Sequence, residues 1–283
     1  MFAARTLVVL ATCFPWPVRA HPDLLVQIQE VTKQLEKEPN NAELYLKRGE
    51  LWRAHADWEA AYADYERAAA LAPDLAVIDL ARGRLFLDFG WPLSARAVLD
   101  RFLSRQPGHV EGLILRARAR TRLNLRLAAA QDYTRAIDLS PEPGPDLFIE
   151  RAQVFAAEGR EYLPAALQGL DEGIRKLGPL VTLQLFAIDM ELKQKNVDGA
   201  LARLDQVAGK SPRKETWLAR RGEILQQAGR PEEARQAFQA ALASFQTLPP
   251  TRRNVPAMLE LERRLRRQVE LIDAAGAGQA KPR

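Results

Sequence analysis

The sequence predicts an all-α protein in which about six helix pairs stack into a solenoid. The first observation is a period, since Pro73, Pro107 and Pro141 follow one another at steps of 34 residues. The second is that small and large residues keep the same step, in the columns Gly49–Gly83–Ala117, Ala61–Ala95–Ala129, Tyr65–Leu99–Tyr133 and Ala68–Phe102–Ala136. The third is that each period holds two stretches with apolar residues at helical spacing, separated by a breaker. Such a unit cannot bury its apolar face alone and must stack on copies of itself.

The period is interrupted once and then resumes. PEPGP at 141–145 and GREYLP at 159–164 have the composition of short insertions. Beyond them, Leu170, Leu204 and Phe238 again lie 34 residues apart. The repeat array therefore covers 42–248, and its six predicted units are 42–75, 76–109, 110–144, 145–180, 181–214 and 215–248.

A capping segment is expected at each end of the array, because stacked repeats expose an apolar face there. Residues 23–38 form one amphipathic pattern ended by Pro39, within an N-terminal cap at 21–41. Residues 249–274 form the C-terminal cap, whose apolar side carries Leu259, Leu261, Leu265, Val269, Leu271 and Ile272. The last residues, 275–283, show no periodicity and are predicted to be a disordered tail.

The columns resemble the tetratricopeptide repeat. The first unit carries the pattern in Tyr45, Gly49, Trp52, Ala61, Tyr65, Ala68 and Pro73. The third and sixth units also match, whereas the fifth is the least typical, with Ile188 in place of a small residue. The resemblance covers about three quarters of the chain. It implies a right-handed α-solenoid and a non-catalytic scaffold or adaptor that binds a protein or peptide. Trp52, Trp58, Tyr62 and Tyr65 are expected to pack between helices rather than to stack on bases.

The first twenty residues predict export. MFAAR carries one positive charge, TLVVLATCF is a short apolar run, and PWPVRA ends in small residues, so 1–20 is interpreted as a signal peptide cleaved before His21. A transmembrane anchor and a buried N-terminal helix are the alternatives, although the run is far shorter than the roughly 20 residues of a span. LATC also faintly resembles a lipoprotein box, which would place a lipid on Cys13. The expected location is periplasmic or secreted.

Composition and motifs argue against an enzyme and against a cofactor. The chain has 41 basic and 36 acidic residues and a formal net charge of +5, a balance that does not call for nucleic acid. There is no G-x-S-x-G elbow and no G-x-x-x-x-G-K loop, and neither His55 nor His109 has a histidine at i+3 or i+4. One alternative is a metal-handling or enzyme-accessory protein that uses His21 at a new N-terminus. Another is an assembly factor that self-associates through the convex face or the C-terminal helix, and the oligomeric state stays open.

The run RARARTRLNLR at 116–126 predicts a basic surface. The resemblance implies that the first helix of each repeat lines a concave groove. Carried over, this register places seven partner-binding residues in the groove: Arg53, Arg84, Leu87, Ile114, Arg118, Thr121 and Arg122. A basic floor with apolar neighbours favours an acidic peptide or a C-terminal carboxylate. The asparagine and lysine of the chaperone-tail clamp are replaced by arginine and leucine, so that ligand is not expected. The alternative is a solvated face whose arginines pair with Asp79, Asp88 and Glu111.

Overall fold

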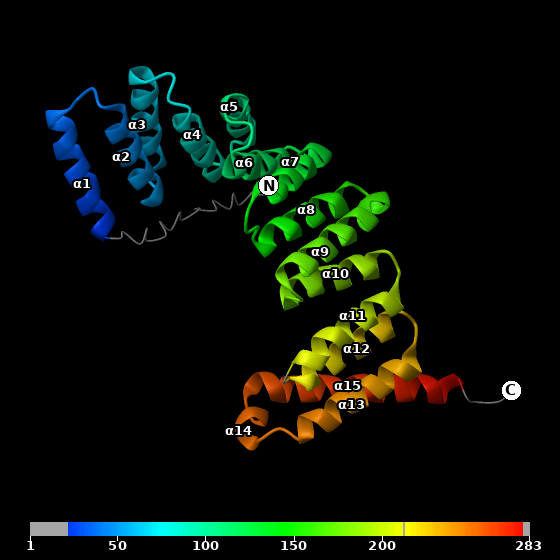
Figure 1. Ribbon diagram of the computed structural model, residues 1–283. Coiled ribbons are helices and arrows are strands. Elements are labelled where there is room, and N and C mark those ends of the chain that lie inside the picture. The colour runs from blue at the N-terminus through cyan, green and yellow to red at the C-terminus, as the bar shows by residue number, and fades with distance from the viewer. Residues whose placement is uncertain (1–21, 212, 280–283) are drawn as a thin grey trace, which may run out of the picture. The chain divides into compact units, whose positions relative to one another are not determined.

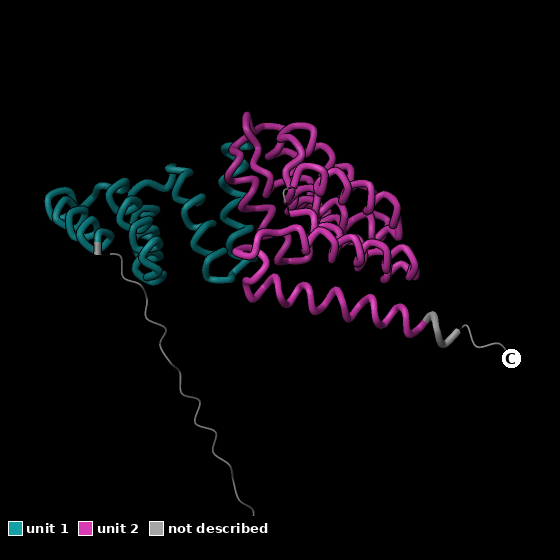
Figure 2. Tube along the Cα trace, turned by 90° about the horizontal axis from the view of Figure 1, so that it is seen from below, with its two compact units in different colours: residues 1–107 teal, residues 108–283 magenta. Residues whose placement is uncertain are grey.

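A computed structural model describes residues 22–211 and 213–279. Within those ranges the regular structure consists of fifteen α-helices and one short 3-10 helix (Figure 1). These residues belong to two compact units, 1–107 and 108–283 (Figure 2). The predicted signal peptide, Cys13 and His21 lie outside the described residues.

Unit 1 contains five helices, which are α1 (Pro22–Lys37), α2 (Ala42–Ala54), α3 (Trp58–Leu71), α4 (Val77–Asp88) and α5 (Pro92–Arg105). Unit 2 begins with three helix pairs, which are α6 (Val110–Arg122) with α7 (Arg126–Leu139), α8 (Pro145–Glu158) with α9 (Leu163–Leu177), and α10 (Val181–Lys193) with α11 (Val197–Lys210). The 3-10 turn η1 (Arg160–Tyr162) separates α8 from α9. Unit 2 ends with α12 (Lys214–Gln227), α13 (Pro231–Gln246), α14 (Pro250–Arg253) and α15 (Pro256–Gln279).

The predicted all-α fold is confirmed. Between residues 42 and 246, six helix pairs follow one another; five fall inside their predicted units, and the sixth begins at Lys214, one residue before its unit. Within each helix pair, the two helices pack on each other. The first helices of neighbouring pairs can also touch, as α2 contacts α4 and α8 contacts α10. The predicted N-terminal helix is α1, which buries Ile28, Val31 and Leu35. The insertion GREYLP forms η1 and the start of α9.

The turn inside five of the six pairs contains one residue with a left-handed backbone. These residues are Ala56, Gly90, Asn124, Lys195 and Gly229, with φ between 58° and 76°. A left-handed residue just past a helix end redirects the chain and lets its N–H satisfy a terminal carbonyl. The helix breakers noted in the sequence therefore mark these turns, and η1 takes this place in the fourth pair.

The repeating small and large columns are explained by close helix packing. Tyr65 is fully buried, and a Cβ atom added at Gly49 would lie 2.6 Å from its Cε1 atom. Trp52 and Trp58 are partly buried against the same cluster, as predicted. Tyr62 differs, because 40% of its surface is exposed. Small residues on the first helix thus make room for large ones on the second.

The C-terminal cap differs from its prediction in two ways. It consists of two helices, α14 and α15, because Pro256 starts a new helix after the short turn at Asn254 and Val255. The second helix continues to Gln279, so the expectation of a disordered tail from 275 is wrong for 275–279. Alanine-rich sequence sustains a helix without an apolar period, which is why periodicity missed this stretch. Only Leu265 and Ile272 of its predicted apolar side are fully buried.

Candidate functional site

The groove arginines of unit 1 are bound to carboxylates of the same unit. Glu50 accepts hydrogen bonds from Arg53 Nε at 3.3 Å and from Arg84 Nη1 at 3.2 Å. It also accepts one from the Tyr65 hydroxyl at 3.0 Å. Arg53 donates a further bond to Asp88 at 2.9 Å. Arg53 therefore fits the alternative prediction, in which the arginines pair with acidic residues of the protein itself. The sequence analysis named Asp88 as such a partner but did not name Glu50.

Leu87 does not belong to an accessible groove, which corrects the prediction from the sequence. Its side chain is 6% exposed. Helix α4 contacts α2, α3 and α5, so neighbouring helices cover most of its circumference. A leucine in this position contributes to the stability of unit 1 and offers little surface to a partner.

The arginine run on α6 is divided between two sides of the helix. Arg116 donates two hydrogen bonds to Asp132 at 2.9 and 2.7 Å, and Arg120 donates one to the same carboxylate at 2.8 Å. Asp132 is 4% exposed, so this pair of like charges is compensated inside the protein. Arg118 lies apart from them and donates two bonds to Glu150 at 3.0 and 2.8 Å.

Glu150 of α8 connects three side chains of unit 2. Besides the two bonds from Arg118, it accepts a hydrogen bond of 2.6 Å from the Tyr133 hydroxyl. Burial alone would raise the pKa of Glu150, but the hydrogen bonds from Arg118 and Tyr133 outweigh it and hold the pKa below its usual range. The hydrogen bond to Glu150 raises the pKa of Arg118. Burial, and then the bond to Glu150, raise the pKa of Tyr133 far above its ordinary value.

These residues border a hollow of about 340 Å³ between α6 and α8, which we call the α6–α8 hollow. Its lining consists of Arg118, Thr121, Arg122, Arg126, Tyr133, Glu150, Gln153, Val154 and Ala157. Three predicted groove residues, Arg118, Thr121 and Arg122, are among them. The fourth predicted residue of this unit, Ile114, is instead packed against the hydrophobic core.

Two lining residues that the sequence analysis did not name, Gln153 and Ala157, follow from the repeat register. The PEPGP insertion lengthens the step from 34 to 35 residues, so Arg118 corresponds to Gln153 and Arg122 to Ala157. Tyr133 was assigned to packing, and its ring is indeed buried at 2% exposure. Its hydroxyl donates to Glu150 at the edge of the hollow, a role that the column pattern does not reveal.

Known proteins match the repeat array. A family model described as a tetratricopeptide repeat matches residues 80–161, and one described as a tetratricopeptide repeat-like domain matches 156–258. The chain belongs to the tetratricopeptide repeat family. No protein with a curated description matches it.

Solved tetratricopeptide repeat structures share the fold at low sequence identity. A protein from Parabacteroides merdae is 19% identical, with a TM-score of 0.54 over 86% of this chain and 93% of that chain. The C-terminal part of a repeat protein from Cytophaga hutchinsonii is 15% identical, with a TM-score of 0.63 over 80% and 92% of the two chains. PilW, described as a type IV pilus biogenesis factor, is 17% identical, with a TM-score of 0.56 over 67% and 86%. Likenesses at this level establish the fold alone.

The described residues contain no candidate metal site and no candidate membrane span. Among the described residues, no three histidine, cysteine, aspartate or glutamate side chains gather closely enough to hold a metal ion. No helix in the described part of the chain has the length and hydropathy needed to cross a membrane. The metal-handling alternative rests on His21, which lies outside the described residues.

Proposed function

We propose that this tetratricopeptide repeat protein is an exported, non-catalytic scaffold that holds an acidic segment or C-terminal carboxylate of a partner protein in the α6–α8 hollow. The repeat fold supports a protein-interaction scaffold. The observation that carries the finer proposal is the charge of the lining. The lining holds three arginines and one carboxylate, that of Glu150, a difference of two positive charges (3 − 1 = 2), and Glu158 outside the lining forms an ion pair of 3.7 Å with Arg126. Guanidinium groups bind carboxylates with directed, paired hydrogen bonds.

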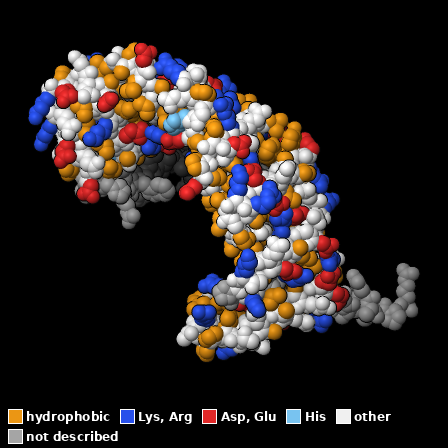
Figure 3. All heavy atoms as spheres, in the orientation of Figure 1, with side chains coloured by type: hydrophobic (Ala, Val, Ile, Leu, Met, Phe, Trp, Pro, Cys, Tyr) orange, Lys and Arg blue, Asp and Glu red, His pale blue; other side chains and the backbone are white. Residues whose placement is uncertain are grey.

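The remaining lining fits a peptide. Thr121 and Gln153 offer hydrogen-bonding groups, while Val154 and Ala157 supply apolar surface. A volume of about 340 Å³ lies within the usual size of a ligand site. Acidic and basic side chains are interspersed over the face shown in Figure 3, so neither sign of charge dominates that face.

Export is proposed from the sequence of residues 1–20 alone. The positive start, the short apolar run and the small residues before His21 are the features that support it. A partner would then be sought in the cell envelope or outside the cell.

The test is affinity capture from a cell-envelope extract with the purified protein as bait. Arg122 is exposed, so Arg122→Glu changes the charge of the hollow without disturbing the core. Arg175→Glu is the matched control, because Arg175 is also an exposed arginine of unit 2 but does not line the hollow. We expect a partner that is retained by the wild type and by Arg175→Glu and is lost with Arg122→Glu.

Salt adds a second criterion, because binding to a cationic hollow must weaken as ionic strength rises from about 0.05 to 0.5 M. The partner's acidic segment, made as a peptide, should then compete. A partner held equally by all three baits, at every salt concentration, would place the binding surface elsewhere and refute the proposed site.

A further inference from the structure

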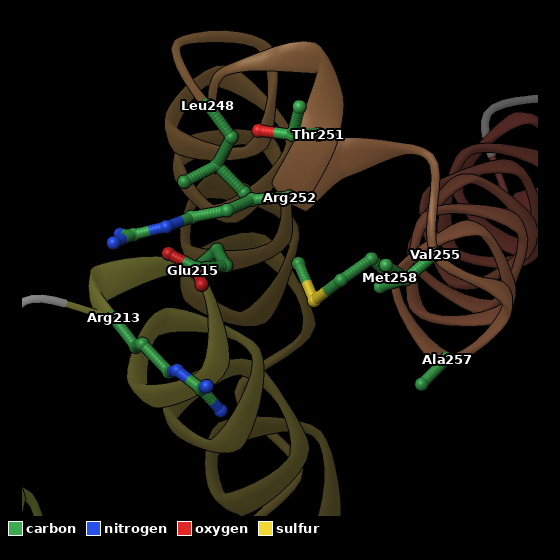
Figure 4. A pocket seen from close by; sticks show the side chains of 8 residues that line it. All are labelled: Arg213, Glu215, Leu248, Thr251, Arg252, Val255, Ala257 and Met258. Carbon is green, nitrogen blue, oxygen red and sulfur yellow. The ribbon is translucent and has the colours of Figure 1, made fainter.

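A second hollow, of about 520 Å³, lies at the C-terminal end of the array, and we call it the terminal hollow. It is bordered by the start of α12, the segment after α13, and the helices α14 and α15 (Figure 4). All of these elements belong to unit 2. The turn that separates α14 from α15 forms part of its edge, through Val255.

The walls of the terminal hollow are largely apolar. Leu248 follows α13, Val255 precedes α15, and Met258 reaches in from the first turn of α15. Val255 is 42% exposed, so apolar surface is open to solvent here. Covering such surface is favourable for an apolar ligand group, at about 25 cal/mol for each Å² removed from water.

Glu215 is the unusual side chain of this site. It is 3% exposed, yet it lines the terminal hollow. Among the described residues, no basic nitrogen lies within 4.0 Å of its carboxylate, and none donates a hydrogen bond to it. Its oxygens are not among the fully buried atoms that lack a partner, so the carboxylate reaches the open space of the hollow. A group that brings a positive charge into the hollow would therefore bind favourably.

Two arginines border the same space. Arg213 and Arg252 are exposed, and neither side chain forms an ion pair with another described residue. In Figure 4 the Glu215 carboxylate lies between the side chains of Arg252 and Arg213. A simple cation would be repelled by the two guanidinium groups, and a simple anion would be repelled by the buried carboxylate. A molecule with both charges satisfies all three side chains.

We propose that the terminal hollow binds a small zwitterion with an apolar side chain, namely a free α-amino acid or a very short peptide with both ends free. Its ammonium group bonds to Glu215, and its carboxylate bonds to the guanidinium group of Arg213 or Arg252 beside it. Its side chain packs against Leu248 and Met258. This site is separate from the α6–α8 hollow and does not depend on the function proposed for that surface.

Calorimetric titration with a matched set of ligands tests the three contacts. L-leucine has both charges and the apolar group, N-acetyl-L-leucine lacks the ammonium group, and L-leucinamide lacks the carboxylate. We expect saturable binding of L-leucine and at least about ten-fold weaker binding of each derivative. The dipeptide Leu-Leu then distinguishes the two sources, since the tighter of leucine and Leu-Leu identifies the preferred length.

Variants assign the contacts to residues. We expect Glu215→Gln and Arg252→Gln each to weaken L-leucine binding about ten-fold or more. Arg253→Gln is the matched control, because Arg253 is the next residue of α14 and does not line the hollow. It should bind L-leucine as the wild type does.

Three outcomes would overturn the proposal. The first is no binding of L-leucine or Leu-Leu up to about 10 mM. The second is equal binding of L-leucine and either blocked derivative. The third concerns stability without ligand, where Glu215→Gln should unfold at the same temperature as the wild type or higher, because its carboxylate forms no ion pair that holds the fold together. A clear loss of stability would mean that Glu215 serves the fold of unit 2.

Discussion

Replacing Gly222 with alanine should destabilise unit 2, although alanine is the better helix former. Gly222 lies in α12 and faces Phe238 of α13, which is 1% exposed. A Cβ atom at this position would lie 2.5 Å from Phe238 Cδ1 and 2.8 Å from Cζ. Those distances are far below the normal contact of carbon atoms, and the buried ring has no free space to enter.

The magnitude follows from two opposing effects. Forcing an extra methyl group into a packed core costs about 1 to 3 kcal/mol, and contacts this short favour the upper end. Alanine offsets about 1 kcal/mol of this loss in stability, because it has the higher helix propensity and reduces the conformational freedom of the unfolded chain. The expected net loss is about 2 kcal/mol, which corresponds to a decrease in melting temperature of roughly 4 to 8 °C.

Gly209→Ala is the matched control. Gly209 lies in the neighbouring helix α11, is exposed, and has no atom within 4 Å of an added Cβ. Only the propensity term applies, so this variant should be more stable by about 0.5 to 1 kcal/mol.

Circular dichroism melts and urea titrations of both variants measure the difference. Because repeat arrays can unfold in parts, the two sites were chosen on adjacent helices of one unit. Opposite signs are expected for the same chemical change. If both variants are more stable than the wild type, contact with the large residue on the facing helix does not explain why Gly222 is a glycine, and the reasoning is refuted.

Other predictions concern the buried polar network of unit 2. Asp132→Asn should cost about 2 to 4 kcal/mol, because Arg116 and Arg120 lose their common carboxylate, and urea titration would detect it. Tyr133→Phe should cost about 1 to 2 kcal/mol through the lost hydrogen bond to Glu150, with unchanged helical content by circular dichroism. The lowered pKa of Glu150 means that the unfolded chain binds its proton more tightly, so its stabilising effect is complete above about pH 4.5 and is lost as the pH falls through the lower folded pKa. Acid titrations of Glu150→Gln should lack this component of the decline, and identical acid curves for variant and wild type would contradict it.

The sequence was sufficient to predict the helix pairs, because the period constrains many positions at once. Proline, glycine and the small residues mark the turns and close contacts, and the helix pairs match the predicted units to within one residue. The C-terminal end was less accurate, since α15 continues through alanine and glycine without an apolar period. Leu87 shows the limit of transferring a register from a family, because the burial of one position depends on the helices that surround it.

The candidate site could be predicted only in part. Arg118, Thr121 and Arg122 of the predicted groove line the α6–α8 hollow together, because they follow the helical register of α6. Their ionic partners could not be, since the bond from Arg118 to Glu150 joins residues 32 positions apart in different repeats. Such pairs depend on how one helix is placed against the next, and spacing within a single helix says nothing about them.

The same network occurs in both units with its direction reversed. In unit 1, the carboxylate of Glu50 lies on an earlier helix than Arg84, which donates to it. In unit 2, Glu150 lies on a later helix than Arg118. In each case a buried tyrosine of the packing column donates to the same carboxylate. The arginine and the carboxylate therefore join neighbouring first helices, and a good part of the groove's charge is used to hold the fold.

A partner in the α6–α8 hollow must consequently bind to the cations that remain in excess. Displacing Glu150 from Arg118 would break two hydrogen bonds and leave a half-buried carboxylate beside the ligand's own negative charge. Arg122 and Arg126 also line the hollow, and Arg126 forms an ion pair of 3.7 Å with Glu158 rather than with Glu150. Charge reversal at Arg122 should accordingly reduce binding without breaking the bonds of Glu150, whereas Arg118→Gln should reduce stability first. If Arg118→Gln abolished binding in a fully folded protein, the carboxylate of the partner would have to replace Glu150, and the division between structural and binding arginines would be wrong.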